Sequence, residues 1–122
     1  GEFTFGKLLK IPSKHKTYKG KVVVIVNELT QSSAEYTTMA FRAGENTTVI
    51  GSTTAGADGN VSSILLPGNI RTMISGKGVF YPDKTQTQRV GIIPDVEVKP
   101  TIDGIKNGKD EPLEKAIELI LK

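Results

Sequence analysis

Residues 21–36 read KVVVIVNELTQSSAEY, and this stretch decides the fold. Five consecutive branched aliphatic residues, Val22 to Val26, predict a fully buried strand, because a strand with one solvated face would alternate apolar with polar residues. A helical pattern opens at Ser32, with apolar residues spaced i, i+3, i+4 and i+7 from Tyr36 onward, and Gly44 is placed to end it. We therefore predict a strand–turn–helix unit with a serine at the helix entrance.

Ser32 has two interpretations on local sequence alone. The first backbone N–H groups of a helix have no partner within it and carry the positive end of its dipole, so they can bind negative charge that develops in a reaction. A serine there is well placed to act as a nucleophile. With Glu35 three positions on, the same serine also matches a capping box, in which the hydroxyl caps the helix and the carboxylate binds the cap's own N–H.

The composition bounds the class of protein. A chain of 122 residues is one domain, large enough to bury a single core. The absence of cysteine excludes disulfides and thiolate metal sites, and His15 has no second imidazole with which to hold a metal. We therefore expect no cofactor and no metal. No run approaches the roughly 20 apolar residues that span a bilayer, so we expect no membrane span.

Positive charge is concentrated at the amino end. Residues 1–21 hold six lysines and one glutamate, a net charge of +5, whereas residues 22–122 hold 10 basic and 12 acidic residues, a net charge of −2. No aromatic stacking platform accompanies the lysines, so we expect a solvated linker and no nucleic-acid binding. We divide the chain into an extended segment with a lysine-rich linker, residues 1–19, and a core, residues 20–122.

A second strand and a long polar loop follow the helix. Residues 47–50 are rich in β-formers, and a strand–helix–strand unit places its two strands parallel in one sheet. Residues 51–60 form a glycine-rich loop at the carboxyl end of that strand, the edge where ligands bind in open α/β sheets, so we expect it beside Ser32. Its glycines have phosphate-loop spacing, but Ala57 and Asp58 replace the lysine and hydroxyl residue that phosphate binding needs, which excludes nucleotides.

The remainder predicts a β-meander and a terminal helix. Short apolar runs at residues 61–66, 70–74 and 79–81 are joined by tight turns, which is typical of a meander. Asp110 is placed to cap a last helix whose single apolar stripe marks it as a packing element.

Four separated motifs carry a resemblance to a known family. They are, in order, Tyr18-Lys-Gly-Lys-Val-Val-Val-Ile-Val-Asn-Glu-x-Thr-x-Ser32-x-Ala-Glu35, Val49-Ile-Gly-x-x-Thr-x-Gly56, Tyr81-Pro-Asp83 and Gly91-Ile-x-Pro-Asp-x-x-Val98. Over about residues 18–121 the chain resembles the catalytic core of the S41 peptidases, the C-terminal processing or tail-specific proteases, with tricorn and the retinoid-binding repeats as relatives. The resemblance implies an α/β fold with a ClpP/crotonase-like core, built from strand–helix–strand units, the β-meander and the C-terminal packing helix.

The resemblance also implies roles for particular residues. Ser32 takes the position of the nucleophile, the backbone N–H of Ser33 would hold part of the oxyanion, and Glu35 would support the helix turn. Processing proteases of this family place a lysine base directly after the loop glycine, but here Gly56 is followed by Ala57. An unassisted serine hydroxyl is a weak nucleophile, so the base has to come from elsewhere.

The tricorn-like branch uses a histidine from upstream of this core as its base. That branch also places an acidic residue where Gln88 falls here. His15 is an unsuitable base because it precedes the amino end of the first strand, whereas Ser32 follows the carboxyl end. We therefore expect the base and further core strands in an upstream segment of the parent chain, and no peptidase activity from these residues alone.

The expected substrate is a peptide or protein bound as an extended strand, with residues 61–66 as the candidate edge. The alternative is a non-catalytic binding module on the same fold, as in the retinoid-binding relatives, and Ala57 favours it. Acyl-CoA chemistry has a related fold but no recognisable motif here. The resemblance suggests a periplasmic or exported location.

Overall fold

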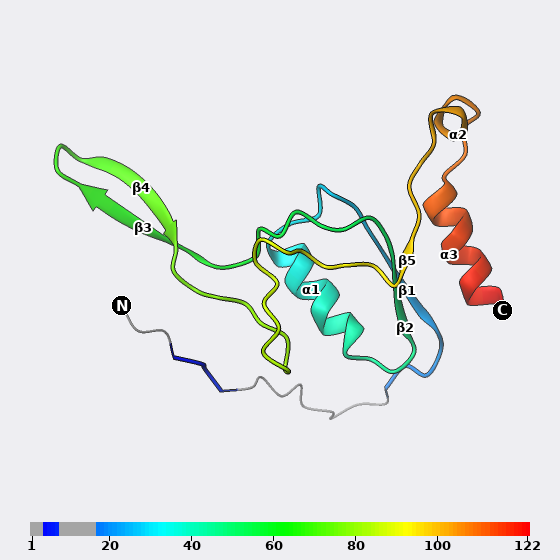
Figure 1. Cartoon of the computed structure of the whole chain (residues 1–122), viewed down its shortest axis with the longest axis horizontal. Helices are drawn as coiled ribbons and strands as arrows, with labels where there is room; N and C mark the ends of the chain where they lie inside the picture. The colour runs from blue at the N-terminus through cyan, green and yellow to red at the C-terminus, as the bar shows by residue number, and fades with distance from the viewer. Residues whose placement is uncertain (1–3, 8–16) are drawn as a thin grey trace.

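The computed structural model describes residues 4–7 and 17–122, and its centre is a parallel sheet with the strand order β1-β2-β5 (Figure 1). The helix α1 connects β1 to β2, and these two strands pair in parallel from Val22 opposite Thr47 to Val26 opposite Gly51. The predicted strand–helix–strand unit is therefore confirmed. The bounds are β1 Val22–Val26, α1 Ser33–Arg42, β2 Thr47–Gly51 and β5 Val96–Glu97.

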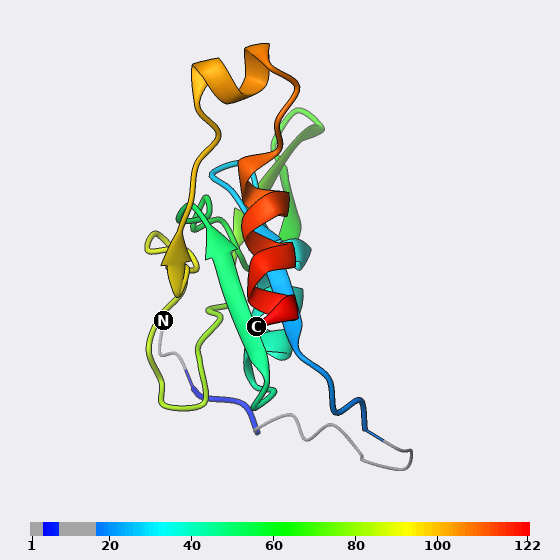
Figure 2. The ribbon, with the colours of Figure 1, turned by 90° about the vertical axis from the view of Figure 1, so that its right-hand side faces the viewer.

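Helices cover the two faces of this sheet. The helix α3, Glu111–Leu121, packs on β1 and β2 from one side, and α1 packs on β2 from the other (Figures 1 and 2). A short helix, α2, Ile102–Lys106, leads into α3. The prediction of a C-terminal packing helix is thus confirmed. The described helices include none that is long and apolar enough to cross a bilayer.

The hydrophobic core lies on the α1 side of the sheet. Val26, Val49 and Ile92 are buried there, and Met39 of α1 packs against them. The prediction that β1 is fully buried was wrong, because only Val26 of its five residues is buried and Ile25 is 44% exposed. The physical reason is that β1 pairs with β2 alone, so it is an edge strand of the described sheet.

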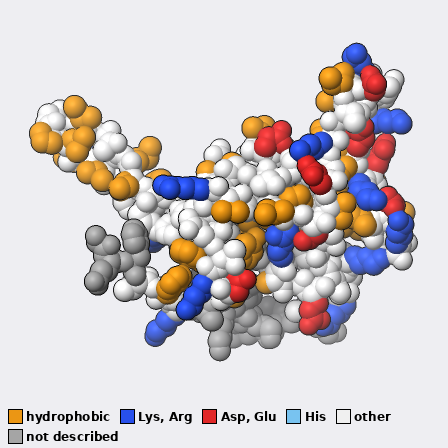
Figure 3. Space-filling model, in the orientation of Figure 1, with side chains coloured by type: hydrophobic (Ala, Val, Ile, Leu, Met, Phe, Trp, Pro, Cys, Tyr) orange, Lys and Arg blue, Asp and Glu red, His pale blue; other side chains and the backbone are white. Residues whose placement is uncertain are grey.

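The predicted meander is reduced to one hairpin. Strands β3, Val61–Leu66, and β4, Ile70–Ser75, pair only with each other, and the expected third strand is a single bridge between Phe80 and Gln86. The hairpin projects from the body, and every residue of its strands is exposed (Figure 1). Hydrophobic side chains cluster toward its outer end (Figure 3).

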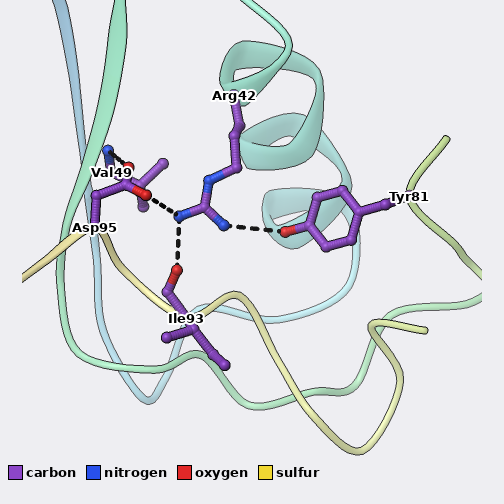
Figure 4. Close-up of polar contacts among 5 residues, drawn as sticks. All are labelled: Arg42, Val49, Tyr81, Ile93 and Asp95. Atoms are coloured by element: carbon purple, nitrogen blue, oxygen red, sulfur yellow. Dashed lines mark hydrogen bonds and ion pairs between the residues drawn. The ribbon is translucent and has the colours of Figure 1, made fainter. Parts of the chain in front are cut away.

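A cluster around Arg42 fixes the segment that precedes β5 (Figure 4). The guanidinium donates to the Tyr81 hydroxyl at 3.2 Å, to the carbonyl of Ile93 at 2.6 Å and to Oδ1 of Asp95 at 3.1 Å. Asp95 Oδ2 accepts the backbone N–H of Val49 at 2.7 Å, and the Asp95 N–H donates to the Val49 carbonyl at 2.7 Å. Two residues of the resemblance motifs, Tyr81 and Asp95, therefore tie α1 and β2 to the segment that carries Ile92.

Candidate active site

The chain after β1 and the chain after β2 meet at one edge of the sheet, as predicted. The N–H of Ser52 donates to the carbonyl of Val26 at 3.1 Å, and the N–H of Ala55 donates to the carbonyl of Thr30 at 3.0 Å. This approach requires glycine at position 51, where φ is +121° and an added Cβ would collide with the Val26 carbonyl. The loop 51–60 is thereby held beside the entrance of α1.

Ser32 has a strained backbone at that entrance. Its φ is 55° and its ψ is −124°, and its exposed side chain faces the Glu35 amide as a capping box requires, without reaching hydrogen-bond geometry. The caps of α2 and α3 are ordinary: Thr101 and Asp110 have φ of −97° and −113°, and each side chain accepts from the N–H three residues on. Positive φ at a residue with a side chain costs about 1–3 kcal/mol and tends to occur at functional sites. Ser32 is thus unlike a simple cap.

The Glu35 carboxylate is the centre of the site. Its side chain is only 1% exposed, yet it accepts four hydrogen bonds. Oε1 accepts from the Thr54 hydroxyl at 2.5 Å and from the Gly56 N–H at 2.8 Å. Oε2 accepts from the Ser32 N–H at 3.0 Å and from the Ala57 N–H at 2.9 Å. A buried carboxylate is tolerated when its lone pairs are satisfied in this way.

Thr54 extends this network to the Gly91 segment. Its hydroxyl donates to Glu35 and accepts the N–H of Ile92 at 2.7 Å. At Gly91, φ is +81° and an added Cβ would lie 2.5 Å from the Thr54 carbonyl, so only glycine permits this packing. Three motifs that are distant in sequence therefore converge on one buried carboxylate.

Ala57 lies next to the helix entrance. Its N–H and that of Ser32 donate to the same carboxylate oxygen of Glu35, so positions 32 and 57 are neighbours in space. The methyl side chain of Ala57 has no proton-accepting atom. Ala57 therefore cannot act as a base for Ser32.

Gln88 serves a different part of the loop. Its Nε2 donates to the carbonyl of Asp58 at 2.7 Å and to that of Lys77 at 2.9 Å, and reaches the Ser75 hydroxyl at 3.5 Å. The amide thus connects the loop 51–60 to the chain that leaves β4. These backbone carbonyls occupy the amide nitrogen of Gln88.

Asp58 is an acidic residue to which the sequence assigned no role in the site. It is 8% exposed, its Oδ1 accepts the N–H of Gly59 at 2.7 Å, and its buried Oδ2 has no hydrogen-bond partner among the described residues. Burial raises the pKa of Asp58, and the charge of Glu35 adds to that rise. Asp58 lines a pocket of about 520 Å³ together with Gly56, Ala57 and Gln88.

The backbone N–H of Ser33 is a further donor at the helix entrance. Ser33 is exposed, and within residues 4–7 and 17–122 its N–H has no hydrogen-bond acceptor. The amides of Gly56 and Ala57, in contrast, are occupied by Glu35. His15 lies outside the described residues, and the described ones contain no cluster of His, Cys, Asp or Glu that would hold a metal ion.

The comparisons with known proteins agree with the sequence motifs. The model of peptidase family S41 matches residues 6–98. The chain belongs to peptidase family S41. No curated protein matches it in sequence.

Solved structures share this S41 fold. A putative peptidase from Parabacteroides merdae is 31% identical with a TM-score of 0.82, and the match covers 91% of this chain and 35% of that chain. Mature CPAF complexed with lactacystin is 20% identical with a TM-score of 0.72, over 88% of this chain and 21% of that one. The tricorn protease is 23% identical with a TM-score of 0.71, over 81% and 10%. This chain thus spans about a third of the length of the P. merdae peptidase.

Two residues of this S41 site were missed by sequence reasoning for different reasons. Thr54 stands in a quoted motif, but its contacts to Glu35 and Ile92 span 19 and 38 residues, and no local pattern announces them. From the sequence, Asp58 served only to exclude a phosphate loop, and the burial of Asp58 depends on the chain around Gln88, whose amide donates to the Asp58 carbonyl.

Proposed function

We propose that the parent protein is a serine endopeptidase in which Ser32 is the nucleophile. The observation that carries the proposal is the strained backbone of Ser32, held by Glu35 at a helix entrance where an ordinary cap would be relaxed. Membership of the S41 family supports the reaction class.

The reaction proceeds in two steps. A base removes the proton of the Ser32 hydroxyl as Oγ attacks the scissile carbonyl carbon, and the backbone N–H of Ser33 donates to the oxyanion that forms. The carbon–nitrogen bond then breaks, the amine leaves with the proton from the base, and water hydrolyses the acyl ester on Ser32. Glu35 and the loop residues Gly56 and Ala57 hold the turn in place, and Gln88 holds the loop.

The base comes from outside residues 20–122 in this proposal. Ala57 supports this, because it occupies the place next to Ser32 and has no basic group. An upstream segment of the same parent, beyond the linker of residues 1–19, supplies the base and completes the core. The chain alone is then inactive. The family resemblance further suggests an exported or periplasmic parent.

The substrate is an extended peptide. Within the described residues β3 has β4 on one edge and no strand on the other, so β3 offers backbone N–H and C=O groups to a peptide strand. The second candidate function is a non-catalytic binding module on the same fold, which Ala57 favours.

Fluorophosphonate labelling separates the two functions. The full-length protein should react with the probe, and its Ser32→Ala variant should not. Equal labelling of both would overturn the nucleophile assignment, and absence of labelling in both would favour the binding module.

A further inference from the structure

We infer that Glu35 is a positioning residue that makes the reactivity of Ser32 depend on the docking of the loop 54–57. The inference rests on the proposed role of Ser32 as nucleophile. Glu35 does not reach the reacting atoms in this role. It acts on the backbone of Ser32, through the hydrogen bond of 3.0 Å from the Ser32 N–H to Oε2.

The relaxed alternative for Ser32 is present elsewhere in the same chain. Asp110 and Thr101 are caps in this form: φ is −113° and −97°, and the side-chain oxygen binds the N–H three residues on. The Thr101 N–H also donates to a carboxylate, Oε2 of Glu111 at 2.6 Å, but Glu111 belongs to α3 and is not bound by the loop 54–57. In that conformation the Ser32 hydroxyl would accept the Glu35 N–H, which it faces in the structure without forming a hydrogen bond. In this inference the conformation with φ of 55°, in which the hydroxyl makes no such bond, is the reactive state.

The donors to Glu35 explain why the loop 54–57 controls which conformation Ser32 adopts. One of the four comes from Ser32, and the other three come from Thr54, Gly56 and Ala57 of the loop. No lysine or arginine of the described residues forms an ion pair with Glu35. If the loop leaves, the buried carboxylate loses three partners at once and has to turn toward water, because a buried charge without hydrogen bonds is costly. Ser32 then loses its clamp.

The hydrogen bonds that hold the loop 54–57 extend to residues 89–92. The Thr54 hydroxyl accepts the N–H of Ile92 at 2.7 Å, and the Gly56 carbonyl accepts the N–H of Arg89 at 2.7 Å. Residues 89–92 therefore close over the loop. A substrate or an upstream segment that orders this part of the molecule would raise the reactivity of Ser32 without touching it.

Glu35→Gln tests the role of the carboxylate in the full-length protein. Glutamine keeps the shape but offers one acceptor oxygen, so its NH₂ group faces two donors in either orientation. We expect the maximal rate constant of fluorophosphonate labelling to fall at least about tenfold, with the half-saturating probe concentration unchanged. The control is Thr101→Ala, which removes the cap of α2 and lowers the melting temperature away from the site, and should label at the wild-type rate.

Two results have distinct meanings. Labelling of Glu35→Gln at the wild-type maximal rate, with Ser32 still the labelled residue, would overturn the positioning role and leave the proposed function standing. Failure of the wild-type protein to label would overturn the proposed function itself.

Amide hydrogen exchange of the wild-type protein tests the coupling without any variant or activity. The N–H groups of Ser32, Gly56 and Ala57 share one acceptor group, so their protection factors, which are corrected for intrinsic exchange rates, should agree within about threefold through one opening event. A protection factor of Ser32 unrelated to those of the two loop amides would overturn the inference even if Glu35→Gln did not fold.

Discussion

At the scale of single residues, the site is defined by the side chain at position 57. The N–H of Ala57 shares Glu35 Oε2 with the N–H of Ser32, so a longer side chain at this position starts beside the proposed nucleophile. Position 57 therefore lies next to Ser32 in space and carries no basic group.

Ala57→Lys should create that base. A neutral amine beside a hydroxyl accelerates nucleophilic attack by about 10²–10⁴-fold when it is well placed, so we expect faster fluorophosphonate labelling of Ser32 as the pH rises. Ala55→Lys is the matched control, since it puts the same group at another exposed position of the loop. If the two lysine variants label at the same rate, a lysine at position 57 does not reach the Ser32 hydroxyl.

The raised pKa of Asp58 predicts how the stability of the protein changes with pH. Burial raises the pKa of its carboxyl above 3.8, so the folded protein binds this proton more tightly than the unfolded chain. Asp58 therefore lowers stability as the pH rises through and above that value, and has no such effect where both states are protonated.

Asp58→Asn removes the buried charge and keeps an oxygen for the Gly59 N–H. The variant should melt at a higher temperature than the wild type at pH 7, and the difference should vanish below about pH 3. Thermal unfolding at the two pH values measures this. A variant that is less stable at pH 7 would mean that the Asp58 carboxylate has a favourable partner.

At the scale of elements, the hydrogen bonds of the Arg42 cluster hold the segment that contains Ile92 in place. Asp95→Ala would leave the N–H of the buried Val49 without its acceptor and would free Arg42 from one partner. We expect a loss of about 1–3 kcal/mol in the free energy of unfolding, measured by urea denaturation. Asp103→Ala, at an exposed position in α2, should cost less than about 0.5 kcal/mol. Equal losses in the two variants would show that the cluster contributes nothing specific.

The elements also show what the sequence could predict. The run Val22 to Val26, the helix opened by Ser32 and the second parallel strand follow from local periodicity, and all three are present. The degree of burial of β1 was mispredicted, because burial depends on which strand lies on its other edge. Periodicity also predicted a strand around Phe80, where the chain forms only one bridge.

The site was predicted in part. Ser32 and Glu35 were paired from their spacing, and the hydrogen bond between them is present. The other three donors to Glu35 lie 19 to 22 residues away, beyond any local pattern. The division into residues 1–19 and 20–122 and the ClpP/crotonase-like form of the complete core stay predictions.

At the scale of the whole molecule, the chain is an S41 domain that spans about a third of the length of the P. merdae peptidase. It contains Ser32, the proposed nucleophile, Ser33, whose N–H is the proposed oxyanion donor, and the hydrogen bond from Ser32 to Glu35. It lacks a base at the position next to Ser32. Its hairpin of β3 and β4 carries apolar side chains that are exposed in this chain (Figure 3).

The whole proposal depends on Ser32 acting as a nucleophile rather than only as a helix cap. The most direct measurement is the site of the fluorophosphonate adduct, located by peptide mass spectrometry in the full-length protein. We expect an adduct on Ser32 that is absent from Ser32→Ala and absent from the 122-residue chain alone. An adduct on another residue, or a Ser32→Ala variant that labels as well as the wild type, would contradict it.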